Sequence, residues 1–224
     1  MTAADAFVDA RNQFLAAQLA GDRRRAVELV SALATRDRGS LFAIRSHVIR
    51  AAQEEIGRLW QENQITIAQE HMATAISQLA LAELFRHEHP RPPNGRTIVI
   101  ACVEGELHDF PARLVADELD LAGYDVRFLG ASVPTDHLLS FLTANRPDLL
   151  VLSATMAFHA DAVRNAVQRL READRDSPVR LPIALGGQLC RWVTTLAHEL
   201  DVEISGGNAG ELVSQADALF GIPS

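Results

Sequence analysis

The chain has 224 residues and a formal net charge of −8, which together narrow the classes of protein it can belong to. Apolar residues make up 48% of the sequence and charged residues 22%, as is typical of a globular protein with one large or two modest domains. Outside Arg23–Arg25 the basic residues form no cluster, so the chain lacks the electrostatic footprint of a direct nucleic-acid binder. No apolar stretch has the length of a signal sequence or a membrane span, and we expect a cytoplasmic location.

Residues 1–88 show only helical periodicity. Between Leu41 and Leu59, apolar side chains recur at three- and four-residue intervals, which predicts a helix with one apolar face. Thr66 and Gln69 fit the capping box that begins a helix. Four helices with short connections predict a four-helix bundle. They are expected over residues 4–20, 23–35, 40–61 and 66–87.

Three prolines and a glycine in residues 89–95, HPRPPNG, disfavour a helix and predict a linker. Beyond it, strand patterns alternate with helix patterns, which predicts a doubly wound, five-stranded parallel sheet in a Rossmann-like α/β domain over residues 96–224. In such sheets ligands bind beyond the carboxyl ends of the strands, near a topological switch point. The strands are expected in TIVIACV, DVRFLG, DLLVLSA, LPIALGG and DVEIS, and the helices over residues 111–123, 135–145, 159–174, 188–199 and 208–219.

Titratable side chains crowd the turn after the first strand, in IVIACVEGELHDFPARL, which contains Glu104, Glu106, His108 and Asp109. One interpretation is that His108 and Asp109 cap the next helix, with Pro111 in its first turn. A phosphate-binding loop is disfavoured, because three carboxylates repel an anion. A histidine between carboxylates is typical of a metal ligand, since a carboxylate that accepts from one ring nitrogen raises the basicity of the other. One histidine cannot hold a bare ion, but it can be an axial ligand to a metal that brings its own macrocycle.

The segment GELHDFPARLVADELDLAGYDVRFLGASVP resembles the cobalamin-binding domain of methionine synthase, methylmalonyl mutase and the corrinoid carriers. Their signature is Asp-x-His-x-x-Gly, then Ser-x-Leu or Ser-x-Thr, then Gly-Gly. Here Glu106 stands at the Asp position, His108 at the His position and Pro111 at the Gly position. The resemblance implies that His108 binds cobalt from below, supported by Glu106, Asp109 and Ser153. The cofactor's corrin and nucleotide tail are expected to contact Gly130, Ser153, Thr155, Gly186 and Gly187, and also Gly206 and Gly207, which ordinary turn chemistry explains equally well.

The sequence departs from this signature at two positions. Glu106 is one methylene longer than aspartate, so we expect its bond to His108 to need a different rotamer or a water. Pro111 places a ring near the path of the nucleotide tail. His137 and His159 begin helices at the same edge of the sheet and are expected to contact amides of the corrin.

A second resemblance lies in the helical half, where LWQENQITIAQEHM places Glu70 and His71 nine residues after Trp60. Taken alone, a core tryptophan beside a solvated Glu-His pair explains these residues. The pattern also resembles the cap of light-sensing cobalamin regulators of the CarH type, in which such side chains enclose the 5′-deoxyadenosyl group above cobalt. The resemblance implies that the cofactor is adenosylcobalamin and that Trp60, Glu70 and His71 form its cap.

Together the two resemblances imply a light sensor rather than an enzyme: photolysis of the cobalt–carbon bond removes the adenosyl group, and the helical cap rearranges. No helix-turn-helix pattern precedes the bundle, so we expect the signal to reach an unidentified output protein or regulator, or to change a homo-oligomer, without nucleic acid or membrane. Gln61 stands where several relatives have a histidine that captures cobalt after photolysis. The alternative is a corrinoid carrier subunit of a methyltransferase system, which needs an open upper face that a Trp-Glu-His cap works against. A mutase is disfavoured because nothing resembles its barrel.

Overall fold

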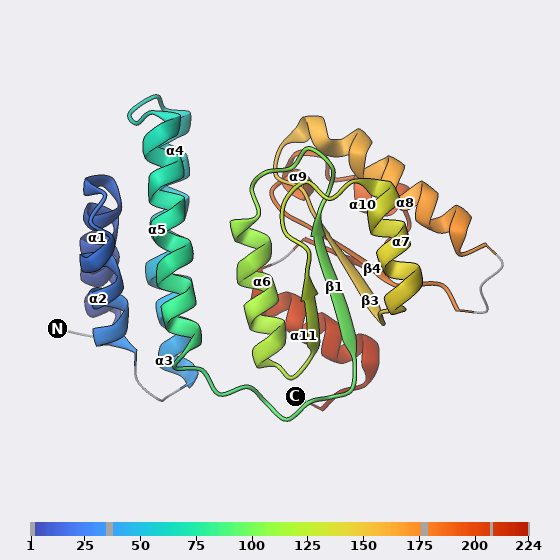
Figure 1. The fold of residues 1–224 in the computed structure, drawn as a ribbon, viewed down its shortest axis with the longest axis horizontal. Coiled ribbons are helices and arrows are strands. Elements are labelled where there is room, and N and C mark those ends of the chain that lie inside the picture. The colour runs from blue at the N-terminus through green and yellow to red at the C-terminus, as the bar shows by residue number, and fades with distance from the viewer. Residues whose placement is uncertain (1–2, 35–37, 176–178, 207, 224) are drawn as a thin grey trace. The chain divides into compact units, whose positions relative to one another are not determined.

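The computed structural model describes residues 3–34, 38–175, 179–206 and 208–223. It confirms the expected fold class, a helical region followed by a five-stranded parallel α/β domain (Figure 1). The chain divides into two compact units, Met1–His89 and Pro90–Ser224. Among the helices in the described ranges, none is both long and apolar enough to cross a membrane.

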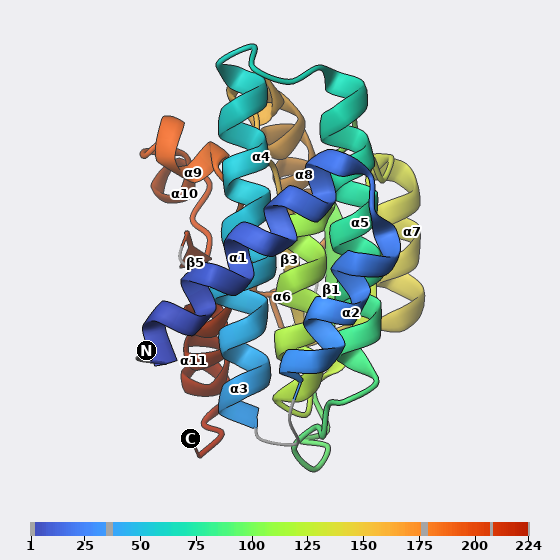
Figure 2. The same ribbon diagram turned by 90° about the vertical axis from the view of Figure 1, so that its left-hand side faces the viewer.

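The helical unit contains α1 (Ala3–Ala20), α2 (Arg23–Leu33), α3 (Arg38–Ala43), η1 (Ile44–Arg50), α4 (Ala51–Gln61) and α5 (Ile67–Phe85). Figure 2 faces this unit and shows α1 and α2 as one layer in front of a second layer formed by α4 and α5. α3, η1 and α4 follow one another without a break, where the sequence predicted one helix over residues 40–61. The middle of this stretch, η1, is a π-helix, which periodicity alone does not reveal.

The α/β unit contains β1 (Thr97–Cys102), α6 (Phe110–Leu121), β2 (Asp125–Phe128), α7 (Thr135–Asn145), β3 (Leu149–Ser153), η2 (Ala157–His159), α8 (Ala160–Ala173), β4 (Ile183–Gly186), α9 (Leu189–Trp192), α10 (Leu196–Glu199), β5 (Ile204–Ser205) and α11 (Ala209–Phe220). The strands pair in parallel in the order β2-β1-β3-β4-β5. Figure 1 shows α6 and α11 on one face of the sheet and α7 and α8 on the other. Alternate side chains of β1 enter the two cores, with Val99 and Ala101 on the α7–α8 side and Ile98, Ile100 and Cys102 on the α6–α11 side.

The helix predicted over residues 188–199 is wrong, because the structure has two short helices there, α9 and α10. The chain leaves the helical conformation at Val193, whose φ and ψ are −121° and 73°. Val193, Thr194 and Thr195 are consecutive β-branched residues, which lose side-chain freedom in a helix. The strand predicted in DVEIS is also shorter than its pattern, since β5 has two residues.

Residues 91–94, within the segment expected to be a linker, are bound to the turn between α6 and β2. The backbone N–H of Arg91 donates to the carbonyl of Leu121, and that of Asn94 donates to the carbonyl of Gly123, both at 2.9 Å. Gly123 has a φ of +92°, and a Cβ there would lie 2.5 Å from the carbonyl oxygen of Pro92. Glycine is therefore required at this close approach.

Two charged contacts flank this segment. Within the helical unit, the side chain of Glu88 forms an ion pair with Arg45, and both side chains are almost completely buried. Within the α/β unit, Asp217 of α11 accepts a hydrogen bond of 2.6 Å from the hydroxyl of Tyr124 and lies 3.5 Å from the guanidinium of Arg91. The chain is thus anchored to one unit just before residue 89 and to the other just after residue 90.

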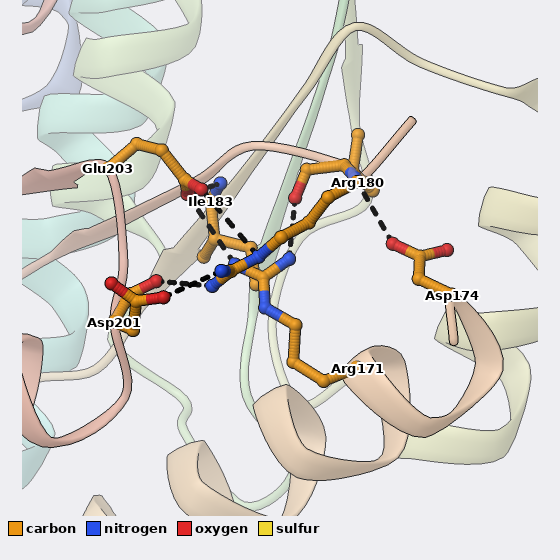
Figure 3. Close-up of polar contacts among 7 residues, drawn as sticks. Arg171, Asp174, Arg180, Ile183, Asp201 and Glu203 are labelled. Atoms are coloured by element: carbon orange, nitrogen blue, oxygen red, sulfur yellow. Dashed lines mark hydrogen bonds and ion pairs between the residues drawn. The ribbon is translucent and has the colours of Figure 1, made fainter. Parts of the chain in front are cut away.

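A charged cluster lies at the edge of the sheet where β4 and β5 begin (Figure 3). Arg171 donates to the carbonyl of Leu181 at 2.7 Å and lies 3.5 Å from Glu203, while Arg180 donates to Asp201 at 2.6 Å. These contacts tie the segments before β4 and β5 to the end of α8. The adjoining cavity, of about 480 Å³, has arginines and carboxylates in equal number on its wall, so we assign the cluster a structural role. The wall consists of Arg171, Asp174, Arg175, Arg180, Glu199, Leu200 and Asp201.

Candidate functional site

The candidate site lies where the chain leaves β1 and β3. The strand order β2-β1-β3 makes this a topological switch point, because the chain passes from β1 to α6 on one face and from β3 to α8 on the other. Residues 103–109 follow β1, and residues 154–159 follow β3. The two loops begin side by side, since the N–H of Val103 donates to the carbonyl of Ser153 at 3.2 Å.

Glu106 is completely buried and binds His108 twice through one carboxylate oxygen. Oε1 accepts the backbone N–H of His108 at 2.7 Å and lies 2.6 Å from Nδ1 of its ring. A carboxylate only accepts, so Nδ1 carries a proton, and in the neutral ring Nε2 then carries the lone pair. The side chain of His108 is 45% exposed although its partner is buried. A buried carboxylate therefore orients an imidazole that is itself partly exposed.

The other carboxylate oxygen of Glu106 reaches the loop after β3. Oε2 accepts the backbone N–H of Thr155 and lies 3.0 Å from Nδ1 of His159, whose side chain is 8% exposed. Burial acts to raise the pKa of Glu106, but hydrogen bonds from the ring and backbone of His108 and from the backbone of Thr155 outweigh it and lower the pKa to about 2. Glu106 is thus a carboxylate at neutral pH, and it joins the two loops.

The residues around Glu106 differ in part from those expected. Thr155 reaches it through its backbone, whereas Ser153 is buried in β3, and none of the hydrogen bonds described joins its hydroxyl to Glu106. His159 was expected to contact corrin amides, but it is buried against Glu106. Asp109 occupies the N-cap position of α6, but its side chain makes no capping hydrogen bond. The position of Asp109 and the proline in the first turn agree with the capping interpretation, but capping does not account for the bonds between Glu106 and His108.

The glycines after β4 differ in what surrounds them. Gly187 has a φ of +92°, and a Cβ there would lie 2.1 Å from the carbonyl oxygen of Ala154, so the backbone admits no side chain. A Cβ on Gly186 would meet no atom within 4 Å. The space beside the end of β4 is therefore open. The other expected glycines are Gly130 and Gly206, which have equally open surroundings, and Gly207, which lies outside the described residues.

In the helical unit, the hairpin of α4 and α5 brings the expected cap residues to one end. Trp60 is in the last turn of α4, and Glu70 and His71 are in the first turns of α5, which begins with the predicted capping box. The side chain of His71 is 71% exposed and that of Glu70 is 19% exposed, with 3.6 Å between His71 Nε2 and Glu70 Oε2. These residues belong to the helical unit, and His108 belongs to the α/β unit.

A chain of hydrogen-bonded polar side chains leads from Glu70 into the bundle core. No local sequence pattern indicates it, because its members come from three helices. Glu70 accepts the hydroxyl of Thr74 at 2.7 Å, and Thr74 accepts from the amide of Gln53. Gln53 accepts the hydroxyl of Ser77 at 2.9 Å, and Ser77 accepts from Gln18 at 2.8 Å. Gln18 and Ser77 are completely buried. Side chains of α1, α4 and α5 are therefore linked to the end of the hairpin.

The donor set suits a metal that is already held by a macrocycle. Among the described residues, no group of three or more His, Cys, Asp or Glu side chains is placed to hold a bare metal ion. One imidazole, backed by a buried carboxylate and presented at a switch point, can supply a single axial bond. This site, together with a preceding helical unit, is the arrangement expected of a two-part corrinoid-binding protein.

The chain belongs to the B12-binding family. The B12 binding domain model matches residues 96–211, and a second B12 binding domain model matches residues 10–84. These matches cover the α/β unit and the helical unit in turn. The protein is thus a cobalamin-binding protein with a B12-binding domain pair.

Named relatives fall into two groups. Over 159 residues, the chain is 31% identical to the HTH-type transcriptional repressor CarH of Myxococcus xanthus, and the match covers 68% of this chain and 50% of the repressor, so the chain spans half of that relative. It is 24% identical over 175 residues to dimethylamine corrinoid protein 2 of Methanosarcina acetivorans, and the match covers 77% of this chain and 79% of that protein. The structure of the monomethylamine corrinoid protein of Methanosarcina barkeri has the same fold, with a TM-score of 0.80 at 19% sequence identity. The match covers 94% of this chain and 98% of that chain.

Proposed function

We propose that the protein is a light sensor that binds adenosylcobalamin, with Nε2 of His108 as the lower axial ligand of cobalt. The 2.6 Å bond between Glu106 and Nδ1 supports this, because it fixes the ring and raises the basicity of Nε2. The open space beside Gly186 can take a flat nucleotide tail. When bound, adenosylcobalamin supplies a cobalt–carbon bond that visible light breaks.

Trp60, Glu70 and His71 form the cap in this proposal. Trp60 offers a face for the adenine to pack against, and Glu70 and His71 can bond sugar hydroxyls or ring nitrogens. The observation that carries the proposal is the polar chain from Glu70 to Gln18, because it links a ligand contact to the interior of the bundle. A helical unit held by such contacts is a two-state element, and losing them changes its packing. The output is an unidentified partner protein or a change of homo-oligomeric state.

A corrinoid carrier subunit of a methyltransferase system is the second candidate function. It is favoured by the similarity to the dimethylamine corrinoid protein, which extends over 77% of this chain. A carrier must expose the upper face of its cofactor to partner enzymes, whereas a light sensor must enclose a large adenosyl group there. The two functions therefore differ in what Trp60 does.

The test compares Trp60→Ala with Trp192→Ala, a matched control in α9 whose tryptophan is 67% exposed. Both proteins are loaded in the dark with adenosylcobalamin or methylcobalamin, and size-exclusion profiles are recorded before and after green illumination. We expect Trp60→Ala to lose about 1–3 kcal/mol of preference for the adenosyl form, as stacked bases lose without their aromatic partner. Its light-driven change of profile should shrink. Trp192→Ala should behave as the wild type does.

Two results would contradict the proposal. A Trp60→Ala protein with full adenosyl selectivity and a full light response would favour the carrier. A His108→Ala protein with an unchanged cobalt spectrum would show that His108 is not the axial ligand.

A further inference from the structure

His159 is buried, and its ring has neighbours on several sides. Its backbone N–H donates to the carbonyl of Met156 at 3.0 Å in the single turn η2. Its ring packs against the edge of Phe158, with 4.3 Å between the ring centroids. On another side it faces Gly105, where a Cβ would lie 3.6 Å from Nε2 of His159. The imidazole therefore has little freedom to turn away from Glu106.

The length of Glu106 explains why such a partner matters. Glutamate has one more rotatable bond than aspartate, so aiming Oε1 at Nδ1 of His108 requires that the carboxylate plane be fixed. The plane is fixed from the far side, where Oε2 meets the backbone N–H of Thr155 and Nδ1 of His159. With His159 replaced by an apolar residue, this buried oxygen would keep one of its two donors. The carboxylate could then rotate, and the His108 ring would lose its fixed partner.

We propose that His159 is a positioning residue of the axial-ligand site: it donates its Nδ1 proton to Oε2 of Glu106 and thereby holds the carboxylate that orients His108. This inference rests on the proposed ligation of cobalt by His108. It concerns this chain's particular solution to a glutamate at the carboxylate position, since the second donor comes from the loop after β3, 53 residues further along the chain.

The experiment removes or keeps the donor at this position. His159→Leu removes it, and His159→Asn keeps an amide N–H close to the place of Nδ1. His198→Leu is the matched control, because His198 is exposed in α10. Three measurements are made. The ring-nitrogen shifts of His108 are recorded by NMR in the cofactor-free protein, and the affinity for cobalamin is determined by titration. The nitrogen splitting is read from the electron paramagnetic resonance spectrum of the bound cobalt(II) form.

We expect His159→Leu to lose the single Nδ1-protonated form of His108 and to show a smaller imidazole-ligated fraction of cobalt. It should also bind cobalamin about 10-fold more weakly, because removing the hydrogen-bond partner behind a metal ligand typically weakens metal binding by at least that factor. His159→Asn and His198→Leu should resemble the wild type. Should His159→Leu fail to fold, His159→Phe takes its place, because its ring fills a similar space and carries no hydrogen-bond donor. The proposal is overturned if the donor-lacking variant keeps the His108 ring state, nitrogen splitting and affinity of the wild type.

The two proposals fail in different ways. A wild-type cobalt(II) spectrum without imidazole splitting would refute the ligation by His108. In that case the ring-nitrogen shifts of the cofactor-free variants still decide whether His159 positions Glu106.

Discussion

Replacing Gly187 by alanine is expected to destabilise the α/β unit even without cobalamin. A side chain at its φ of +92° costs about 1–2 kcal/mol. Its Cβ would also lie 2.1 Å from the carbonyl oxygen of Ala154, and forced overpacking costs typically about 1–3 kcal/mol more. That carbonyl accepts the N–H of Leu189 at 3.1 Å, so moving it disturbs the start of α9. We expect Gly187→Ala to lower the free energy of unfolding by about 2–5 kcal/mol.

Gly186→Ala is the matched comparison one residue earlier. A Cβ there meets nothing within 4 Å, so the free energy of unfolding should stay within about 0.5 kcal/mol of the wild type. The same open space is where we propose the nucleotide tail binds, so Gly186→Ala should weaken cobalamin binding. Urea unfolding of the cofactor-free variants, followed by titration with cobalamin, measures both effects.

The two variants separate a backbone requirement from a ligand requirement. Wild-type stability of Gly187→Ala would refute the close approach to Ala154. Wild-type affinity of Gly186→Ala would refute a tail slot beside β4.

Two further outcomes concern stability. Burial raises the pKa of Glu106, but hydrogen bonds from His108 and Thr155 outweigh it and lower the pKa from its ordinary 4.5 to about 2. The ionised carboxylate therefore stabilises the fold above about pH 4.5, by on the order of 3 kcal/mol. This stability is lost as the pH falls through about 2. Urea unfolding at pH 2–6 should show this loss in the cofactor-free wild type and a smaller loss in Glu106→Gln; equal losses would contradict it. Tyr124→Phe removes the 2.6 Å bond to buried Asp217 and should lower the free energy of unfolding by about 1.5–3 kcal/mol, measured by thermal unfolding, with no change speaking against the bond.

Local patterns predicted the fold because they record which side chains a helix or strand must bury. The expected helix over residues 135–145 coincides with α7, and Thr66 and Gln69 form the expected capping box. The break between α9 and α10 was missed because a helical pattern of apolar residues outweighed the β-branched run.

The candidate site was less predictable, because its contacts join distant segments. Glu106 and His108 lie two positions apart in the sequence, so a contact between them could be expected from the sequence alone. The contact of Glu106 with His159 depends on β1 lying beside β3, and no local pattern encodes that order. The polar chain from Glu70 to Gln18 likewise spans three helices. The advance sign of the contact between Glu106 and His159 was the position of His159 at the start of the helix after β3.

The anchoring of the chain on both sides of residues 89 and 90 limits how the joint can work. Glu88 is tied to Arg45 in one unit, and Arg91 is tied to Leu121 in the other. Between them stand His89 and Pro90, both exposed, and the ring of Pro90 fixes one of the few backbone torsions. Only a few backbone torsions lie between these two anchors, so fixing the joint in one conformation costs little conformational entropy.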